Sequence, residues 1–257
     1  TAVLECYVLD MSERIRWKDR PAVILCPGGA YRFTNDRESE PLACAFLAEG
    51  YHVFSLRYST EKGIYPAALE QLARTVRLIR QNAGEWHVRK DAIVITGFSA
   101  GGHLAAEYAC KWDRPALSAA AEAEREELRP NALVLGYPVI TAGAAAHEES
   151  IHNLLGAQDT PKMRRSVSLE TQVSGCVPPV FLWHTATDEM VNAENSLLFA
   201  SALAREKIPY ELHIYGSGVH GVSLGTRATV GEEKHVSHGC AGWFAQAARF
   251  LERVLHE

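Results

Sequence analysis

A serine flanked by two glycines, in the stretch Gly97–Gly101 (GFSAG), has a spacing typical of nucleophilic catalysis. The apolar run Ala92–Thr96 precedes it and an apolar helical pattern follows, so the serine is predicted to lie on a strand-to-helix turn. Glycines suit this turn because it is tight and other backbone passes close to it. The helix N-terminus behind the serine favours developing negative charge. We therefore interpret Ser99 as a nucleophile for acyl transfer, with a glycine-rich packing turn as the alternative.

A serine nucleophile requires a base that takes its proton and an acid that orients that base. Where the serine lies on a turn of this kind, the acid comes next in the chain and the histidine last. Asp188 follows the apolar run Val180–Trp183, and we predict it as the acid, with its neighbour Glu189 as the alternative. His220 lies in a glycine-rich loop after the last predicted strand, and we predict it as the base. The simpler interpretations are a solvated or capping Asp188 and a turn role for His220.

The other late histidines fit catalysis less well, since His213 lies within a predicted strand and His256 stands near the C-terminus. His235 and His238 have the HxxH spacing of a weak metal pair, but only Cys240 stands in ligand spacing with them. We interpret both as loop histidines. No metal and no organic cofactor is expected.

Acyl transfer also requires N–H donors for the oxyanion that forms on the substrate carbonyl. Ala100, which follows the nucleophile, is expected to supply one of them. The loop Cys26–Tyr31 (CPGGAY) ends an apolar run and has the shape of an HGGG loop, with Pro27 in place of its histidine. Gly29 and Ala30 are therefore predicted to supply further backbone donors, and a simple PGG turn is the alternative.

These residues must be positioned by strands that alternate with helices. The predicted strands are Ala22–Cys26, His52–Leu56, Ala92–Thr96, Ala132–Leu135, Val180–Trp183 and Tyr210–Tyr215, with Val3–Leu9 as a candidate edge strand. The first five of these lack clean polar–apolar alternation, which is typical of strands buried on both faces. Helical patterns cover Pro41–Gly50, Pro66–Asn82, Ala100–Lys111, Asn195–Glu206 and Cys240–His256. The pattern predicts an α/β fold with a doubly wound, mostly parallel sheet flanked by helices.

A single domain is predicted for residues 1–257, because α/β folds of this length are often undivided. The segment 141–177 interrupts the alternation and is predicted to cover the carboxyl edge of the sheet as a small lid. The segment Ser118–Glu127 is rich in alanine and glutamate, which suits an exposed helix or a mobile insertion. We assign no function to it.

Composition limits the possible classes of function. Asp and Glu total 31 against 26 Lys and Arg, and this net charge of −5 argues against broad nucleic-acid binding. No apolar segment reaches the roughly 18 residues of a membrane helix, and the first twenty residues contain no signal-type apolar run. We therefore expect no membrane partner and a cytoplasmic location. The six cysteines are widely spaced without a CxxC motif and are expected to be reduced and mostly buried.

Five stretches together resemble the small bacterial acetyl-esterase/lipase group of α/β-hydrolases, within it the acetylxylan-esterase-like or sugar-ester hydrolases. They are ILCPGGAY, RESEPLACAFLAEGYHV, GFSAGGHLAA, PPVFLWHTATDEMV and GSGVHGVSL. The resemblance implies a serine esterase for acetyl groups of carbohydrates or other small alcohols, with nucleophile, acid and base at Ser99, Asp188 and His220. Ala30 departs from the pattern, which more often has a third glycine there. Its N–H donor remains, while its methyl group is expected to narrow the acyl pocket or tighten the loop.

The resemblance also suggests weaker candidates. Tyr31 is a candidate for stacking on a sugar ring, or else a packing aromatic. Glu38 is a candidate for binding substrate hydroxyls, with capping of the following helix as the alternative. Trp183 and His184 flank the acid loop and are candidate walls of the pocket. His103, on the helix that follows the nucleophile, is expected to be structural.

We therefore predict a serine carboxylesterase that hydrolyses short-chain, chiefly acetyl, esters through an acyl-enzyme, with acetylated xylo-oligosaccharides as candidate substrates. One alternative is an amide or peptide hydrolase of the oligopeptidase or formamidase type that uses the same three residues. The other is a non-catalytic fold that binds a small ligand. The expected partner is a small-molecule ester, and the sequence carries no information on the oligomeric state.

Overall fold

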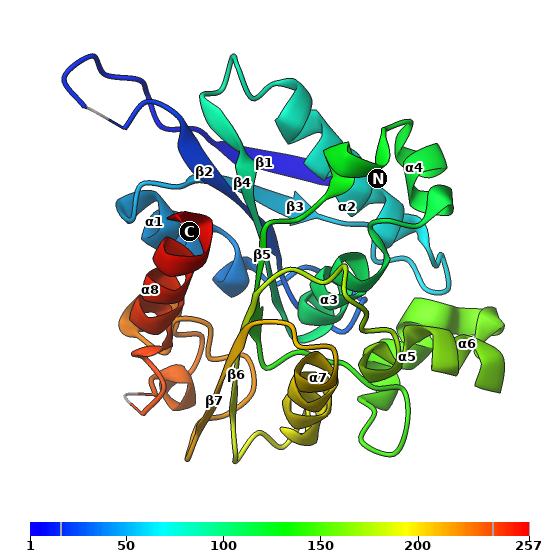
Figure 1. Cartoon of the computed structure of the whole chain (residues 1–257). Helices are drawn as coiled ribbons and strands as arrows, with labels where there is room; N and C mark the ends of the chain where they lie inside the picture. The colour runs from blue at the N-terminus through cyan, green and yellow to red at the C-terminus, as the bar shows by residue number, and fades with distance from the viewer. Residues whose placement is uncertain (16, 238, 257) are drawn as a thin grey trace.

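The chain forms a seven-stranded sheet in the order β1-β3-β2-β4-β5-β6-β7 (Figure 1). The computed structural model describes residues 1–15, 17–237 and 239–256, of residue 256 only the backbone. Within these residues β1 runs antiparallel to β3, and the other strand pairs are parallel. The strands are β1 Val3–Tyr7, β2 Arg20–Cys26, β3 His52–Arg57, β4 Val88–Phe98, β5 Ala132–Gly136, β6 Val180–Thr185 and β7 Tyr210–Tyr215.

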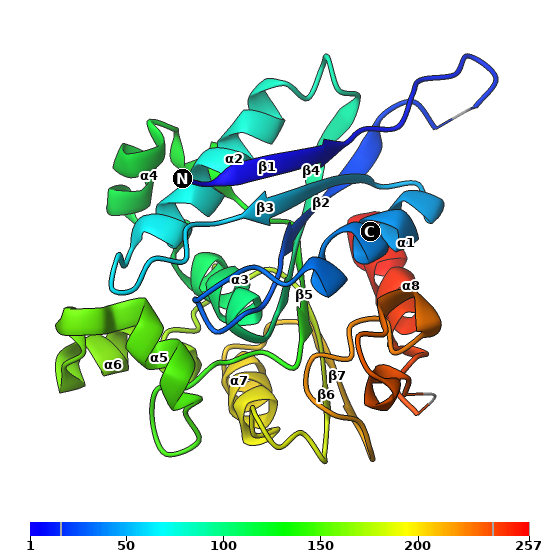
Figure 2. The ribbon, with the colours of Figure 1, turned by 180° about the vertical axis from the view of Figure 1, so that it is seen from behind.

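Helices cover both faces of the sheet, as Figures 1 and 2 show from opposite sides. Helices α1 and α8 pack on one face, over side chains such as Val94 and Phe181. Helices α2, α3 and α7 pack on the other face, over side chains such as Ile95 and Leu182. Their bounds are α1 Glu40–Ala48, α2 Ala67–Gln81, α3 Ser99–Lys111, α7 Glu194–Arg205 and α8 Trp243–His256. Neighbouring residues of the central strands thus alternate between two apolar layers, which explains the unbroken apolar runs in the sequence.

The predicted fold class is confirmed, because the sheet is mostly parallel and doubly wound with helices on both faces. Each predicted strand is present, including the edge strand near the N-terminus, although β4 begins four residues earlier than expected. The five predicted helices agree with the structure to within about three residues at each end.

Of the two expectations for the alanine- and glutamate-rich segment, the structure agrees with the exposed helix and not with the mobile insertion. It forms the end of α4 (Pro115–Ala121) and a 3₁₀ helix, η2 (Arg125–Leu128), which pack beside α2. Leu117 and Leu128 are buried beneath it. The guanidinium of Arg77 donates to the carbonyl oxygen of Ala121 at 2.7 Å, which ties the segment to α2.

Segment 141–177 carries two short helices, α5 (Glu148–Leu155) and α6 (Pro161–Val167). Figure 1 shows them beside α3 and α7, on the side of the sheet away from α1 and α8. Ile151 and Leu155 of α5 and Val167 of α6 are buried against the core of that side.

In the described part of the chain, no helix is long and apolar enough to cross a membrane.

All six cysteines are free, but fewer are buried than expected. Cys26, Cys110 and Cys240 are buried, whereas Cys6 and Cys44 are exposed and Cys176 is half-buried.

Candidate active site

Ser99 is the first residue of α3 and directly follows the last residue of β4. Its φ is 54°, a left-handed conformation that costs a residue with a side chain about 1–3 kcal/mol. A Cβ on Gly101 would lie only 2.0 Å from the carbonyl oxygen of Cys26, and one on Gly97 only 2.2 Å from the carbonyl oxygen of Gly101. Gly101 therefore lets the turn lie directly against the end of β2, and Gly97 lets the turn close tightly on itself, in agreement with the predicted tight turn.

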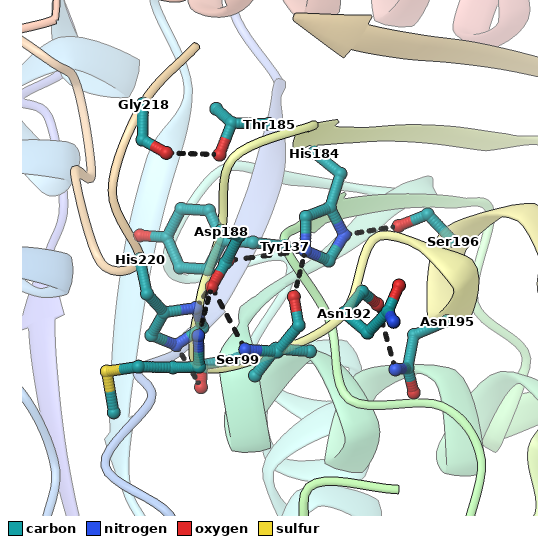
Figure 3. Close-up of polar contacts among 12 residues, drawn as sticks. Ser99, Tyr137, His184, Thr185, Asp188, Asn192, Asn195, Ser196, Gly218 and His220 are labelled. Atoms are coloured by element: carbon teal, nitrogen blue, oxygen red, sulfur yellow. Dashed lines mark hydrogen bonds and ion pairs between the residues drawn. The ribbon is translucent and has the colours of Figure 1, made fainter. Parts of the chain in front are cut away.

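Ser99, His220 and Asp188 lie in a hydrogen-bonded row (Figure 3). Nε2 of His220 is 2.8 Å from Oγ of Ser99, and Nδ1 of His220 is 2.7 Å from Oδ2 of Asp188. The three residues follow β4, β7 and β6, whose carboxyl ends share one edge because these strands are parallel. Since Nδ1 donates to the carboxylate, Nε2 is left to accept the hydroxyl proton of Ser99. Glu189, the alternative acid, is exposed.

The carboxylate of Asp188 is surrounded by hydrogen-bond donors (Figure 3). Its Oδ1 accepts from the backbone N–H groups of Met190 and Val191, both at 2.9 Å. Its Oδ2 faces His220 and also Nε2 of His184 at 3.3 Å. Burial would raise the pKa of Asp188, but the hydrogen bonds from the two histidines and the backbone outweigh it and hold this pKa well below its usual range. Asp188 is therefore charged at neutral pH.

His184 has a role that the sequence analysis missed. Its side chain is fully buried, so it is not a wall of the cavity. Nε2 is 2.9 Å from the carbonyl oxygen of Val191, and Nδ1 is 2.8 Å from Oγ of Ser196 (Figure 3). His184 thus joins β6, the acid loop and α7. A histidine four residues before the acid was the available signal, but the contact arises only because the loop folds back over the strand end.

The loop after β2 lies directly against the nucleophile. A Cβ on Gly28 would lie 2.9 Å from Cβ of Ser99, so only glycine fits there. Gly29 and Ala30 line the same cavity as Ser99 and have φ values of 131° and 54°. Within the described residues, the N–H groups of Gly29, Ala30 and Ala100 form no hydrogen bond. These three groups are therefore free to bind a negatively charged oxygen.

Glu38 does not cap the following helix and is not open to substrate, because its side chain is almost fully buried. Its Oε2 accepts from the N–H of Gly28 at 2.7 Å, and its Oε1 accepts from the hydroxyl of Tyr137 at 2.6 Å. Burial raises the pKa of Glu38, although the two hydrogen bonds act against this rise. The residue braces the loop after β2.

Tyr31 and Trp183 also lie in the interior, where they do not meet a bound sugar. The hydroxyl of Tyr31 is 2.9 Å from Nδ1 of His103, whose Nε2 is 2.9 Å from the carbonyl oxygen of Val167. His103 is therefore structural, as predicted. Trp183 is fully buried and stacks on Trp243 with ring centroids 5.0 Å apart.

A cavity of about 630 Å³ opens beside Ser99 and His220. Its wall mixes basic and acidic side chains with histidines: Arg32, Arg37, Lys234, Glu149, Glu189, Glu232, His147 and His235. Glu38 reaches this wall only with the 1% of its surface that is exposed. Arg32 and Glu149 form an ion pair at 3.2 Å. Such a wall, with nearly balanced charge, suits a neutral polar ligand better than a strongly charged one.

Sequence reasoning missed two residues of this wall. The ring of Phe33 lines the cavity and is 48% exposed, so it offers the aromatic surface that was expected of Tyr31. His147 also lines the cavity, with Nδ1 2.8 Å from Oγ of Ser150. Burial lowers the pKa of His147, which favours its neutral form. No local pattern marks either residue, because both reach the cavity through the folding of long loops.

The described residues include only one histidine of the HxxH pair. Nδ1 of His235 accepts a hydrogen bond from the N–H of Glu232 at 2.9 Å, which fits a loop histidine. His238 lies outside the described residues.

Comparison with known proteins gives a family match, because the family BD-FAE matches residues 9–203. A relative by sequence is endo-1,4-beta-xylanase B of Butyrivibrio fibrisolvens, which is 36% identical over 209 residues, or 80% of this chain and 33% of that protein. The chain spans between a third and just under half of the length of the curated relatives it matches.

Solved structures are similar over nearly the whole chain. The acetyl ester-xyloside bifunctional hydrolase of Caldicellulosiruptor lactoaceticus has a TM-score of 0.84 and 33% identity, covering 98% of this chain and 87% of that one. The carboxylesterase Cest-2923 of Lactobacillus plantarum has a TM-score of 0.87 and 31% identity, covering 97% of this chain and 92% of that one. These similarities confirm the predicted α/β-hydrolase fold, and both of these solved proteins are ester hydrolases.

Proposed function

The chain belongs to the BD-FAE family, and from this membership we propose that it is a serine esterase that removes acetyl groups from carbohydrates such as acetylated xylo-oligosaccharides. The observation that carries the proposal is the row from Ser99 Oγ through His220 to Asp188, at 2.8 and 2.7 Å, beside a cavity of about 630 Å³. No metal or organic cofactor takes part in this scheme.

The proposed reaction begins when Oγ of Ser99 attacks the ester carbonyl and Nε2 of His220 takes the hydroxyl proton. The carbonyl oxygen becomes an oxyanion, which the N–H groups of Gly29, Ala30 and Ala100 stabilise. When the C–O bond to the alcohol breaks, His220 returns the proton to the leaving oxygen and an acetyl-enzyme remains. A water molecule, deprotonated by His220, then attacks the acetyl group and releases acetate and free Ser99.

Asp188 supports these steps through its charge. The carboxylate holds Nδ1–H of His220 and so keeps Nε2 turned toward the serine. Its negative charge also stabilises the imidazolium that forms when His220 takes the proton.

We propose that the segment 141–177 acts as the small lid over the acyl side of the site. His147 and Glu149 of this segment line the cavity, and Nδ2 of Asn153 donates to the carbonyl oxygen of Ala30 at 2.8 Å. The contact couples the segment to the oxyanion loop, and the methyl group of Ala30 narrows the space beside it. Both features favour acetyl over longer acyl groups.

The lining of the cavity as a whole supports a neutral, hydroxyl-rich leaving group. Its charges are nearly balanced, and its polar side chains supply both donors and acceptors. The exposed ring of Phe33 offers an apolar face on which a sugar ring can stack.

The test is acetate release from acetylated xylo-oligosaccharides, other acetylated sugars and an aryl acetate. Ser99→Ala should lower kcat by about 10⁴- to 10⁶-fold, because no other group supplies the nucleophile. Ser217→Ala, an exposed serine in the loop of His220, is the matched control and should keep the wild-type rate. A Ser99→Ala enzyme with wild-type turnover would refute the mechanism.

Other substrates test the finer parts of the proposal. Faster turnover of hexanoyl or octanoyl esters than of acetyl esters would contradict the acyl preference. Faster turnover of peptide amides or formyl-kynurenine-like amides would favour the amide hydrolase. A wild-type protein that a fluorophosphonate fails to label would favour a ligand-binding fold.

A further inference from the structure

One buried carboxyl group connects the loops that surround the nucleophile. Glu38 is only 1% exposed, and its two oxygens accept hydrogen bonds from different parts of the chain. Oε2 accepts from the N–H of Gly28 at 2.7 Å, and Oε1 accepts from the hydroxyl of Tyr137 at 2.6 Å. The same tyrosine oxygen accepts from the N–H of Ser223 at 3.0 Å. Glu38 is therefore the centre of a chain of hydrogen bonds through three loops.

Each of these loops carries a part of the reacting geometry. Gly28 immediately precedes the oxyanion donors that follow β2. Tyr137 follows β5, and its ring lies edge-on to the imidazole of His220 with centroids 4.9 Å apart. Ser223 lies three residues after His220 in the loop that follows β7. The chain of hydrogen bonds thus joins the oxyanion loop to the loop of the base.

The residue before Glu38 strengthens the same connection. Arg37 donates from Nη1 to the carbonyl oxygen of Gly221 at 2.9 Å, and its own carbonyl oxygen accepts from Oγ of Ser223 at 2.7 Å. Gly221 directly follows His220 in the chain, and Ser223 lies three residues after it. The 3₁₀ helix η1 (Asp36–Glu38) is therefore bonded to the loop of His220 by its backbone and by its side chains.

Backbone strain is concentrated where these hydrogen bonds act. Eight residues other than glycine have a positive φ in the described part of the chain, and five of them belong to the loops around the nucleophile. The five are Ala30, Tyr31, Ser99, Tyr137 and Ser223. Left-handed residues of this kind persist only where surrounding contacts hold them. The hydrogen bonds at Gly28, Tyr137 and Ser223 supply such contacts.

We infer that Glu38 is a positioning residue for the reaction, which sets the oxyanion donors and His220 in one geometry without touching the substrate. The inference rests on the proposed function, because it assigns Glu38 to the acyl transfer of Ser99. It departs from the expectation that Glu38 binds substrate hydroxyls, since both oxygens are engaged and the side chain is buried.

The substitution Glu38→Gln keeps the shape of the side chain and removes one of its two acceptor oxygens. The amide nitrogen must then face either the N–H of Gly28 or the hydroxyl of Tyr137, and both of these are donors in the wild type. Glu40→Gln is the matched control, because Glu40 is exposed and only two residues away. Displacement of reacting groups by about 1 Å can cost about 100-fold in rate. We expect Glu38→Gln to lower kcat about 10- to 100-fold with KM within about threefold, and Glu40→Gln to leave both unchanged.

Coupling to Tyr137 separates a positioning role from general loss of stability. Tyr137→Phe removes the hydroxyl that Glu38 binds and should lower kcat by a similar factor. If both substitutions break the same connection, kcat of the double variant Glu38→Gln/Tyr137→Phe should lie within about threefold of kcat of the slower single variant. The rate at which a fluorophosphonate labels Ser99 should rank the variants in the same order as kcat does. Labelling is measured at a temperature where thermal melting shows every variant folded.

Three outcomes would overturn the inference. In the first, kcat of Glu38→Gln is unchanged. In the second, KM for the sugar ester rises while kcat and the labelling rate are kept, which would assign Glu38 to substrate binding. In the third, the fold-decreases in kcat of the two single variants multiply in the double variant. If Glu38→Gln does not fold, Tyr137→Phe alone decides, and an unchanged kcat in that variant refutes the inference. Ser99→Ala keeps the two proposals distinct, since a failed esterase assignment leaves wild type and Ser99→Ala equally inactive on esters.

Discussion

The acid loop after β6 and the oxyanion loop after β2 each depend on one buried carboxyl group, but the two groups are held differently. Asp188 faces four donors, two of them imidazoles, and its pKa is lowered. The side chain of Glu38 is buried to the same degree but faces only two uncharged donors, and its pKa is raised. The comparison shows that the number and type of donors, more than burial, decide whether the pKa of a buried carboxyl is lowered or raised. A charged group suits the orientation of a base, and a group with few partners suits the bracing of a loop.

The largest effect is expected where the charge itself is removed. Asp188→Asn keeps the shape of the side chain but should lower kcat by about 10⁴-fold, because His220 loses the partner that holds its tautomer. Glu189→Gln changes the neighbouring acid and should keep kcat within about twofold. Steady-state kinetics on an aryl acetate measures both. The opposite pattern, with Glu189→Gln inactive, would show that the acid is assigned to the wrong residue.

A smaller effect is expected when Asp188 keeps its charge and loses one partner. His184→Phe removes the contact at 3.3 Å and the bond to the carbonyl oxygen of Val191, so the acid loop should shift. We expect kcat to fall about 10- to 100-fold. His213→Phe, on β7 and directed at Glu211, is the control and should retain activity. A His184→Phe enzyme within twofold of wild type would mean that the other donors suffice to hold Asp188.

The smallest expected effect is on the free energy of unfolding, and its pH dependence has opposite signs for the two carboxyls. The lowered pKa of Asp188 means that its contribution is present above the unfolded value of about 3.9 and is lost as the pH falls through the folded pKa. The raised pKa of Glu38 means the reverse, since its contribution is present at low pH and is lost as the pH rises through the folded pKa.

Urea unfolding at pH 2 to 7 should reveal this difference. Relative to wild type, Asp188→Asn should lose stability as the pH rises from about 2 to about 5, by about 1–3 kcal/mol for unpaired buried donors. As the pH rises above the unfolded value of about 4.3 for a glutamate, Glu38→Gln should gain stability relative to wild type. If the free energy of unfolding changed with pH in the same direction in both variants, the two carboxyls would not have oppositely shifted pKa values.

Sequence patterns predicted much of the site because the relevant signals are local. The GFSAG stretch predicts a tight turn by itself, and glycine is required there by contacts as close as 2.0 Å. The order of serine, acid and histidine along the chain follows from the order of parallel strands whose ends meet at one edge. The lid and the catalytic roles stay predictions, although the three side chains are brought together.

The supporting residues were not predicted because their contacts are long-range. Trp183 and Tyr31 lie next to functional loops in the sequence, yet strand pleating and loop folding turn both into the core. Phe33, two residues after Tyr31, takes the place at the cavity that was expected of the tyrosine. Neighbouring side chains of an extended segment point to opposite sides, so an assignment that is wrong by one residue exchanges a buried side chain for one at the cavity.

The sequence by itself determined the fold class and the residues of the hydrogen-bonded row, because hydrophobic periodicity and glycine spacing report on neighbours in the chain. Only the tertiary structure decided which carboxyl has its pKa lowered beside the base and which has its pKa raised while it braces a loop. Glu38 and Tyr137 are 99 positions apart, and His220 is 32 positions from Asp188. Hydrogen bonds across such separations depend on how several loops pack over one sheet edge, and that packing sets both the geometry and the local electrostatics of the site.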